Sequence, residues 1–153
     1  MLRASKDDAK IGELIAGYID GGNLAPDDLM MQFIISRLRQ PDCGDGYLFD
    51  GFPRTIRQAE MFDLFLSETD AKLDRVIHLV AEVPELISRL LARAKIEGRA
   101  DDTLETIKSR LEIYQKRTAP VLEFYQQQGL VHLVNAMQSP DEVFEELELL
   151  CAG

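Results

Sequence analysis

An aspartate and an arginine that could together bind a phosphorylated ligand lie in the segment DGFPRT at residues 50–55, which Gln58 follows. The preceding apolar run, residues 46–50, predicts a buried strand that ends at Asp50, and ligands of open α/β sheets bind beyond the carboxyl ends of strands. A carboxylate there can hold the waters around a magnesium ion, and the guanidinium of Arg54 can bind a phosphate through two parallel hydrogen bonds. By themselves these residues favour a plainer interpretation, a strand-to-helix turn whose arginine lies in solvent.

A second feature is a local reversal of charge in an acidic chain. The net charge is −10, yet residues 89–117 hold eight basic and five acidic residues, a balance of +3 that leaves −13 for the rest. Arg110 lies between Ile107 and Tyr114 on the apolar side of a predicted helix, where a cation is costly unless a carboxylate or an anion meets it. The segment fits an anion-binding surface and an ordinary ion-paired helical hairpin equally well.

The composition narrows the class of protein. With 46% hydrophobic residues the 153-residue chain can bury a core, while its acidity argues against a nucleic-acid binder or an anionic-membrane binder. No apolar run approaches the roughly 20 residues that span a bilayer. Cys43 and Cys151 lack metal-site spacing and are typical of free thiols in a reducing compartment. We therefore expect a soluble, cytoplasmic protein.

The elements that must position these residues alternate between helices and strands. Apolar periodicity and capping residues predict strands at 46–50, 75–80 and 130–134, and helices at 8–19, 27–40, 56–66, 84–97, 103–128 and 141–150. Thr55 is placed to cap one helix, and Ser139 to cap the last. This alternation indicates an α/β fold, a parallel sheet with helices on both faces.

The motifs of the chain, and the order in which they follow one another, resemble those of the adenylate kinases. The resemblance runs nearly end to end, through MLRA (1–4), YIDGGNLAPDDL (18–29), DGFPRTIRQAE (50–60), VPELISRLLAR (83–93), GRADDTLETIKSRLEIYQKRTAP (98–120) and LVHLVNA (130–136). The most specific parts are DGFPRT-xx-Q and GR-x-DD with a second arginine eleven residues after the first. The resemblance implies the P-loop nucleoside monophosphate kinase fold and phosphoryl transfer from ATP to AMP, giving two ADP, with Mg²⁺.

The resemblance also implies a role for individual residues. Those expected to hold AMP are Arg3, Ala25, Gly51, Arg54 and Gln58. Those expected to hold ATP are Arg89, Arg93, Arg99, Ala136 and Met137, and those expected to act in catalysis are Arg54, Arg89, Arg99 and Arg110. Asp50 would bind magnesium through water. The chain would be one domain, 1–153, with a helical AMP-binding part at 1–39 and a short lid at 93–99, monomeric when complete.

One element of the resembled family has no counterpart in these residues. Its Gly-rich loop, of the form Gly-x-x-x-x-Gly-Lys, cradles the ATP phosphates with backbone N–H groups and a lysine, and the 153 residues contain no Gly-Lys pair. We therefore expect an N-terminally truncated chain without turnover. Three alternatives stay open: a UMP/CMP kinase, a non-catalytic AMP-binding module, and an acidic interaction domain. Thr55 and Gln58 favour AMP, because the related pyrimidine kinases place Asn after the arginine.

Overall fold

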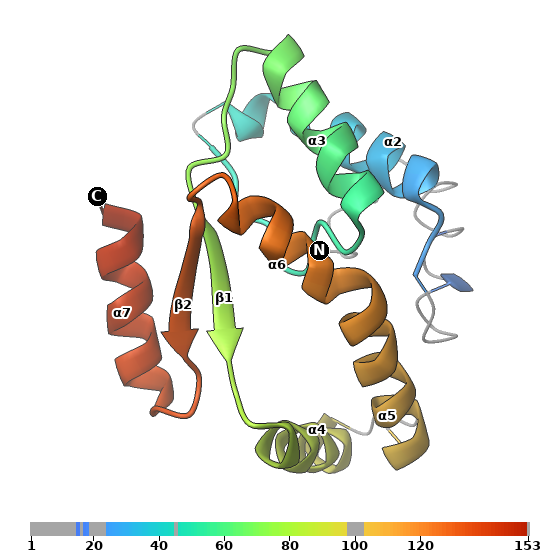
Figure 1. Cartoon of the computed structure of the whole chain (residues 1–153), viewed down its shortest axis with the longest axis vertical. Coiled ribbons are helices and arrows are strands. Elements are labelled where there is room, and N and C mark those ends of the chain that lie inside the picture. The colour runs from blue at the N-terminus through green and yellow to red at the C-terminus, as the bar shows by residue number, and fades with distance from the viewer. Residues whose placement is uncertain (1–14, 16, 19–23, 45, 98–102, 153) are drawn as a thin grey trace. The chain divides into compact units, whose positions relative to one another are not determined.

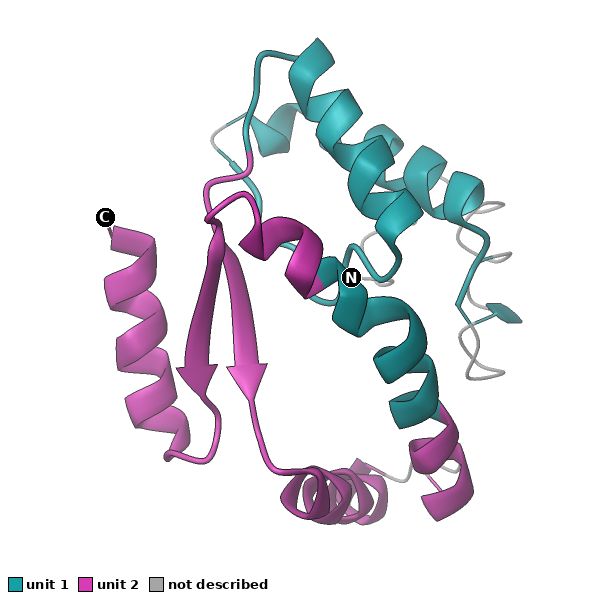
Figure 2. Cartoon of the chain, viewed as in Figure 1, with its two compact units in different colours: residues 1–72, 110–121 teal, residues 73–109, 122–153 magenta. Residues whose placement is uncertain are grey.

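The structure, a computed structural model, describes residues 15, 17, 18, 24–44, 46–97 and 103–152. The chain divides into two compact units, which Figure 2 distinguishes by colour. Unit 1 consists of residues 1–72 and 110–121, and unit 2 consists of residues 73–109 and 122–153. The expected helix at 8–19 lies largely outside the described residues, although residues 15, 17 and 18 are helical.

Unit 1 is built on two helices that pack against each other, α2 (Asp27–Leu38) and α3 (Ile56–Glu68), with a short 3₁₀ turn, η3 (Pro41–Cys43), between them in sequence (Figure 1). Acidic residues in the first turn of α2 favour a helix start there, since they complement the helix dipole. The two helices contribute the buried apolar side chains Met31, Phe33, Ile34, Ala59, Phe62 and Leu66.

The N-terminus of α3 is capped as the sequence predicts. The Thr55 side-chain oxygen accepts a hydrogen bond from the backbone N–H of Gln58 at 3.1 Å, which satisfies one of the helix's unpaired donors. Ala59, Phe62 and Leu66 follow at helical spacing and are buried. The capped end therefore fixes where the DGFPRT loop stops and α3 begins.

The predicted strand at residues 46–50 is wrong. The described residues of this segment form no strand, and Tyr47 and Leu48 are exposed. A strand needs a neighbour to pair with its N–H and C=O groups, and the described sheet pairs only β1 with β2. The ring of Phe49 instead lies 5.2 Å from that of Phe52 and 5.3 Å from that of Phe62, centroid to centroid. Aromatic packing, and not sheet pairing, anchors this run.

Unit 2 contains the parallel strands β1 (Val76–Val80) and β2 (Val131–Asn135), which confirm two of the predicted strands and the α/β class. Their register runs from Val76 opposite Val131 to Val80 opposite Asn135. β1 leads into helix α4 (Val83–Glu97), and α7 (Pro140–Ala152) follows β2 and packs against it (Figure 1). Partial burial lowers the pKa of His78, in β1, below its usual range.

The helix predicted over 103–128 forms as three successive helical segments. These are α5 (Leu104–Ile113), the π-helical turn η4 (Tyr114–Thr118) and α6 (Ala119–Gln126). Pro120 lacks an N–H and disturbs the ordinary i to i−4 pattern, and the N–H of Ala119 donates five residues back, to the Tyr114 carbonyl. Such turns recur at functional sites. No helix of the described part of the chain is both long and apolar enough to cross a membrane.

Candidate functional site

The side chain of Arg54 folds back against Gly51, within the loop between residues 50 and 55. Arg54 Nε donates to the Gly51 carbonyl at 2.7 Å, and Gly51 has a φ of 72°, a conformation that glycine adopts without strain. A Cβ at position 51 would come 2.7 Å from Nη2 of Arg54. Glycine is therefore needed twice here, for the backbone turn and for the close approach of the guanidinium.

The peptide of Arg54 is held on both sides. Its N–H donates to Oε1 of Gln58 at 2.8 Å, and its carbonyl accepts from Oγ1 of Thr118 at 3.0 Å. The side chain itself is exposed. An exposed guanidinium on a fixed backbone is a preorganised binding group for a planar or tetrahedral anion, because its terminal nitrogens can donate in parallel.

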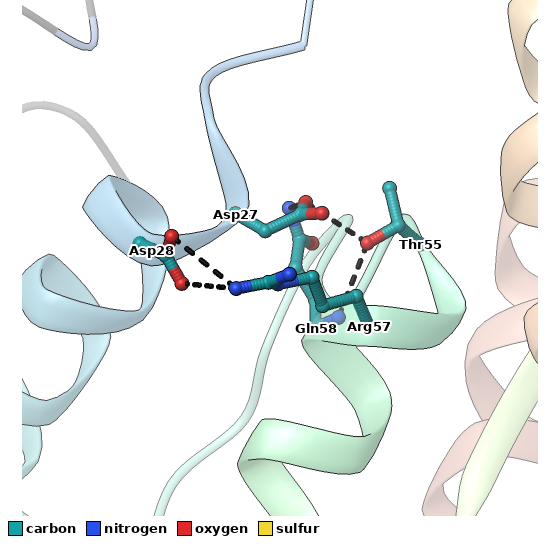
Figure 3. Close-up of polar contacts among 5 residues, drawn as sticks. All are labelled: Asp27, Asp28, Thr55, Arg57 and Gln58. Atoms are coloured by element: carbon teal, nitrogen blue, oxygen red, sulfur yellow. Dashed lines mark hydrogen bonds and ion pairs between the residues drawn. The ribbon is translucent and has the colours of Figure 1, made fainter.

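Gln58 belongs to a buried polar network that sequence reasoning missed (Figure 3). The Gln58 side chain is 2% exposed, and its Nε2 donates to Oδ1 of Asp27 at 2.8 Å. The same Asp27 oxygen accepts from Oγ1 of Thr55 at 2.9 Å. One sequence signal could have pointed to Gln58: Thr55-x-x-Gln58 has the spacing of a capping box, in which the glutamine side chain hydrogen-bonds to the backbone at the start of the helix. No sequence signal pointed to Asp27, which is 31 residues from Gln58.

An ion pair at the surface also links α2 and α3. Arg57 Nη2 lies 3.0 Å from Oδ1 of Asp28, and both side chains are about two-thirds exposed, at 64% and 65%. Water screens a pair this exposed, so it contributes little to stability. Asp27 and Asp28 thus differ sharply, because the first meets a buried amide and the second meets a solvated arginine.

Two further residues expected near AMP or magnesium lie close in sequence to these contacts. Ala25 is buried, at 5% exposure, just before α2. Asp50 is exposed and immediately precedes Gly51. Among the described residues no three His, Cys, Asp or Glu side chains cluster as a metal site. An exposed carboxylate fits a hydrated magnesium ion, which uses one or two carboxylates together with substrate phosphates.

In unit 2 the first arginine of α4 reaches the turn that follows β2. Arg89 Nη1 donates to the Ala136 carbonyl at 2.8 Å, and its Nε donates to Oε1 of Glu85 at 2.7 Å. Met137 is 42% exposed, and its N–H donates to Oδ1 of Asn135 at 2.9 Å. The structure thus brings together three of the residues expected to hold ATP.

The same turn leads into α7 through a short capping arrangement. The backbone N–H and the hydroxyl of Ser139 both donate to Oε2 of Glu142, at 2.9 and 2.7 Å. These hydrogen bonds hold the pKa of the Glu142 carboxyl below its usual value. Ser139 Oγ in turn accepts from the Glu142 N–H at 3.3 Å, which confirms the predicted cap of the last helix.

Of the remaining expected site residues, two are described by the structure and two are not. Arg93 lies one turn after Arg89 on α4 and is half-buried. Arg110, in α5, is half-buried as well. Arg3 and Arg99 lie outside the described residues, as do parts of the expected segments 1–39 and 93–99. Thr118 was missed, since nothing in the sequence marks its hydroxyl as a partner of the Arg54 carbonyl.

Comparison with known proteins gives one consistent result. A family model described as adenylate kinase matches residues 1–130. An adenylate kinase of Rhodopirellula baltica is 48% identical over 139 residues, covering 91% of this chain and 71% of the relative. One from Maricaulis maris is 43% identical over 144 residues, covering 94% and 77%. One from Kocuria rhizophila is 41% identical over 142 residues, covering 93% and 76%.

Proposed function

The chain belongs to the adenylate kinase family of nucleoside monophosphate kinases, and we propose that residues 51–58 form its AMP phosphate site. The observation that carries the proposal is the exposed guanidinium of Arg54 on a peptide fixed by Gln58 and Thr118. Binding a phosphate there costs little ordering of the loop, since the backbone is already held. The family implies ATP, AMP and ADP as substrates, and the reaction as phosphoryl transfer from ATP to AMP.

On the AMP side we assign the phosphate to Arg54 with help from Arg3, and the base to Gln58. The backbone near Ala25 and at Gly51 would complete this pocket. Support comes from unit 1 alone, where Gly51 allows the Arg54 guanidinium to lie against the loop at 2.7 Å from the Gly51 carbonyl. Gln58, being buried and already hydrogen-bonded, would contribute from a fixed position.

On the ATP side we assign the arginines to charge neutralisation during transfer. Arg89, Arg93, Arg99 and Arg110 would bind the donor phosphates and the transferring group, and Ala136 and Met137 would contact the adenine of ATP. The hydrogen bond from Arg89 to the Ala136 carbonyl supports a common site for those two residues. Phosphoryl transfer needs no covalent intermediate, so positioning and electrostatic stabilisation account for most of the catalysis.

We assign magnesium to the neighbourhood of Asp50, through water. Asp50 is exposed beside the Arg54 loop, and a hydrated magnesium ion bound mainly by nucleotide phosphates needs few protein ligands. When bound, the ion would neutralise charge on the phosphates. The role of Asp50 would be to orient the metal-bound waters, while Arg54 holds the acceptor phosphate.

AMP is favoured over CMP and UMP by the residues that follow the arginine. Thr55 stands where the related pyrimidine kinases place Asn, and Gln58 follows three residues later. We also propose a monomer in the cytoplasm; Cys43 and Cys151 are free thiols, as is typical of a reducing compartment.

The experiment is calorimetric titration of the 153-residue chain with AMP, CMP and UMP, together with an assay of ADP formation from ATP and AMP. Because these residues contain no Gly-Lys pair, we expect AMP binding with little or no turnover by this chain. Loss of one preorganised donor lowers rates by about 10²–10³. Absence of AMP binding would overturn the site, tighter binding of CMP or UMP would overturn the substrate, and turnover at an ordinary kinase rate would overturn the role given to the loop.

A further inference from the structure

We propose that Asp27 is a positioning residue for the AMP site. Its carboxylate fixes the side-chain amide of Gln58, and Gln58 in turn fixes the peptide that carries Arg54. The inference rests on the proposed function, because it takes Arg54 and Gln58 as residues of the AMP site. Asp27 itself would not touch the nucleotide.

The chemistry of the carboxylate decides the orientation of the glutamine. An ionised carboxylate only accepts hydrogen bonds, so the NH₂ end of the Gln58 amide must face Asp27. The oxygen end then faces the N–H of Arg54, as the 2.8 Å contact shows. A flipped amide would set oxygen against oxygen at Asp27 and N–H against N–H at Arg54. Asp27 therefore selects one of two orientations, and that orientation is the one that holds the loop.

Burial makes this selection stringent. Gln58 is 2% exposed and Thr55 is 9% exposed, so water cannot readily replace a lost partner. A buried polar group without a partner loses its full solvation energy. Because one oxygen of Asp27 accepts from both Gln58 and Thr55, removing it would free two buried donors together.

The neighbouring aspartate provides a matched control. Asp27 and Asp28 share the first turn of α2, so removing either changes the charge at the same helix end. Asp28 pairs with the exposed Arg57 and makes no hydrogen bond to Gln58 in the described network. A loss seen with Asp27 and not with Asp28 would therefore report on the glutamine and not on helix charge.

Three variants separate the acceptor from the charge. Asp27→Leu keeps much of the volume and removes the acceptor, and we expect AMP binding to weaken about tenfold or more. Asp27→Asn keeps an oxygen that can accept from both donors, so binding should stay within about threefold of the original. Asp28→Ala should also stay within about threefold.

The measurements are AMP titration by calorimetry on the whole chain and amide hydrogen exchange at the Arg54 N–H. Asp27→Leu should raise the exchange rate of the Arg54 amide, while Asp27→Asn and Asp28→Ala should leave it near the original rate. Unchanged affinity and exchange in Asp27→Leu would overturn the inference, as would an equal loss in Asp28→Ala or Asp27→Asn. If the original chain binds no AMP, the proposed function fails, while the exchange rates still decide the role of Asp27.

If Asp27→Leu does not fold, exchanging the carboxylate and the amide between positions 27 and 58 provides a second test. Gln58→Glu sets two carboxylates against each other and should speed exchange of the Arg54 amide. Adding Asp27→Asn places an amide donor at position 27 opposite the carboxylate at position 58. The Arg54 amide should then exchange slowly again in the double variant. Coupling of this kind identifies direct partners. Protection no better in the double variant than in Gln58→Glu would contradict the proposal.

Discussion

In unit 1 the peptide of Arg54 is held at both its N–H and its carbonyl, by Gln58 and Thr118, whereas in unit 2 Arg89 is held through its side chain. The partners of Arg54 include a glutamine that is almost fully buried, while Arg89 and its ion-pair partner Glu85 are 48% and 39% exposed. Contacts fixed by buried groups cost more to disturb than contacts in water. The comparison indicates that the backbone of the 51–58 loop is held more firmly than the side chain of Arg89 on α4.

The largest expected effect comes from removing the guanidinium of Arg54. Two charge-assisted hydrogen bonds to a phosphate are each worth about 1.5–3 kcal/mol, so Arg54→Ala should weaken AMP binding by at least about a hundredfold. The side chain is exposed, so the free energy of unfolding should fall by less than about 1 kcal/mol. Calorimetric titration beside thermal melting measures both.

Arg57→Ala is the control for that prediction. Arg57 is also an exposed arginine at the start of α3, and it pairs with Asp28. Its removal should leave AMP affinity within about threefold. Equal losses in the two variants would mean that general positive charge, and not the Arg54 loop, attracts AMP.

A smaller effect should follow from a methyl group at Gly51. Gly51→Ala must adopt a φ of 72°, which costs about 1–2 kcal/mol for a residue with a Cβ, and its Cβ would press on Nη2 of Arg54. We expect the protein to lose about 1–2 kcal/mol of stability. We also expect AMP binding to weaken about tenfold, because the Arg54 guanidinium must shift. Thermal melting and titration of the same sample test the two effects separately.

Unit 2 offers a matched control for Gly51→Ala. Gly129 has a φ of 73°, and a Cβ built there would have no heavy atom of the described residues within 4 Å beyond Gly129 and its two chain neighbours. Gly129→Ala should therefore carry a similar backbone cost without loss of AMP affinity. If AMP binding weakened equally in both variants, the close approach of Arg54 to Gly51 would not explain the requirement for glycine.

The smallest effect should come from the ion pair on α4. Glu85→Ala removes an exposed i, i+4 partner of Arg89, and pairs of this kind contribute about 0.3–0.5 kcal/mol. The midpoint of chemical denaturation should therefore move only slightly. A loss above about 1.5 kcal/mol would show that Arg89 is held as firmly as Arg54, and would remove the contrast between the units.

Much of the local structure could be predicted from the sequence. The helix starts at Asp27 and after Thr55, the strands near 76–80 and 131–135, and the cap at Ser139 all depend on residues within a turn or two of each other. The DGFPRT motif carried the family for the same reason, since its residues are contiguous. An apolar run alone was not enough at 46–50, because a strand also requires a partner; β1 and β2 have one in each other, and the described part of 46–50 has none.

The family and the α/β class follow from the sequence, and so does the position in the chain of each arginine that we propose binds phosphate. Tertiary structure alone decided that Asp27 meets Gln58 and that Thr118 meets the carbonyl of Arg54, across 31 and 64 residues. Helix periodicity and capping act over a few residues, so one sequence expresses them directly. A hydrogen bond between distant residues exists only after helices have packed and excluded water, and its geometry is set by that packing.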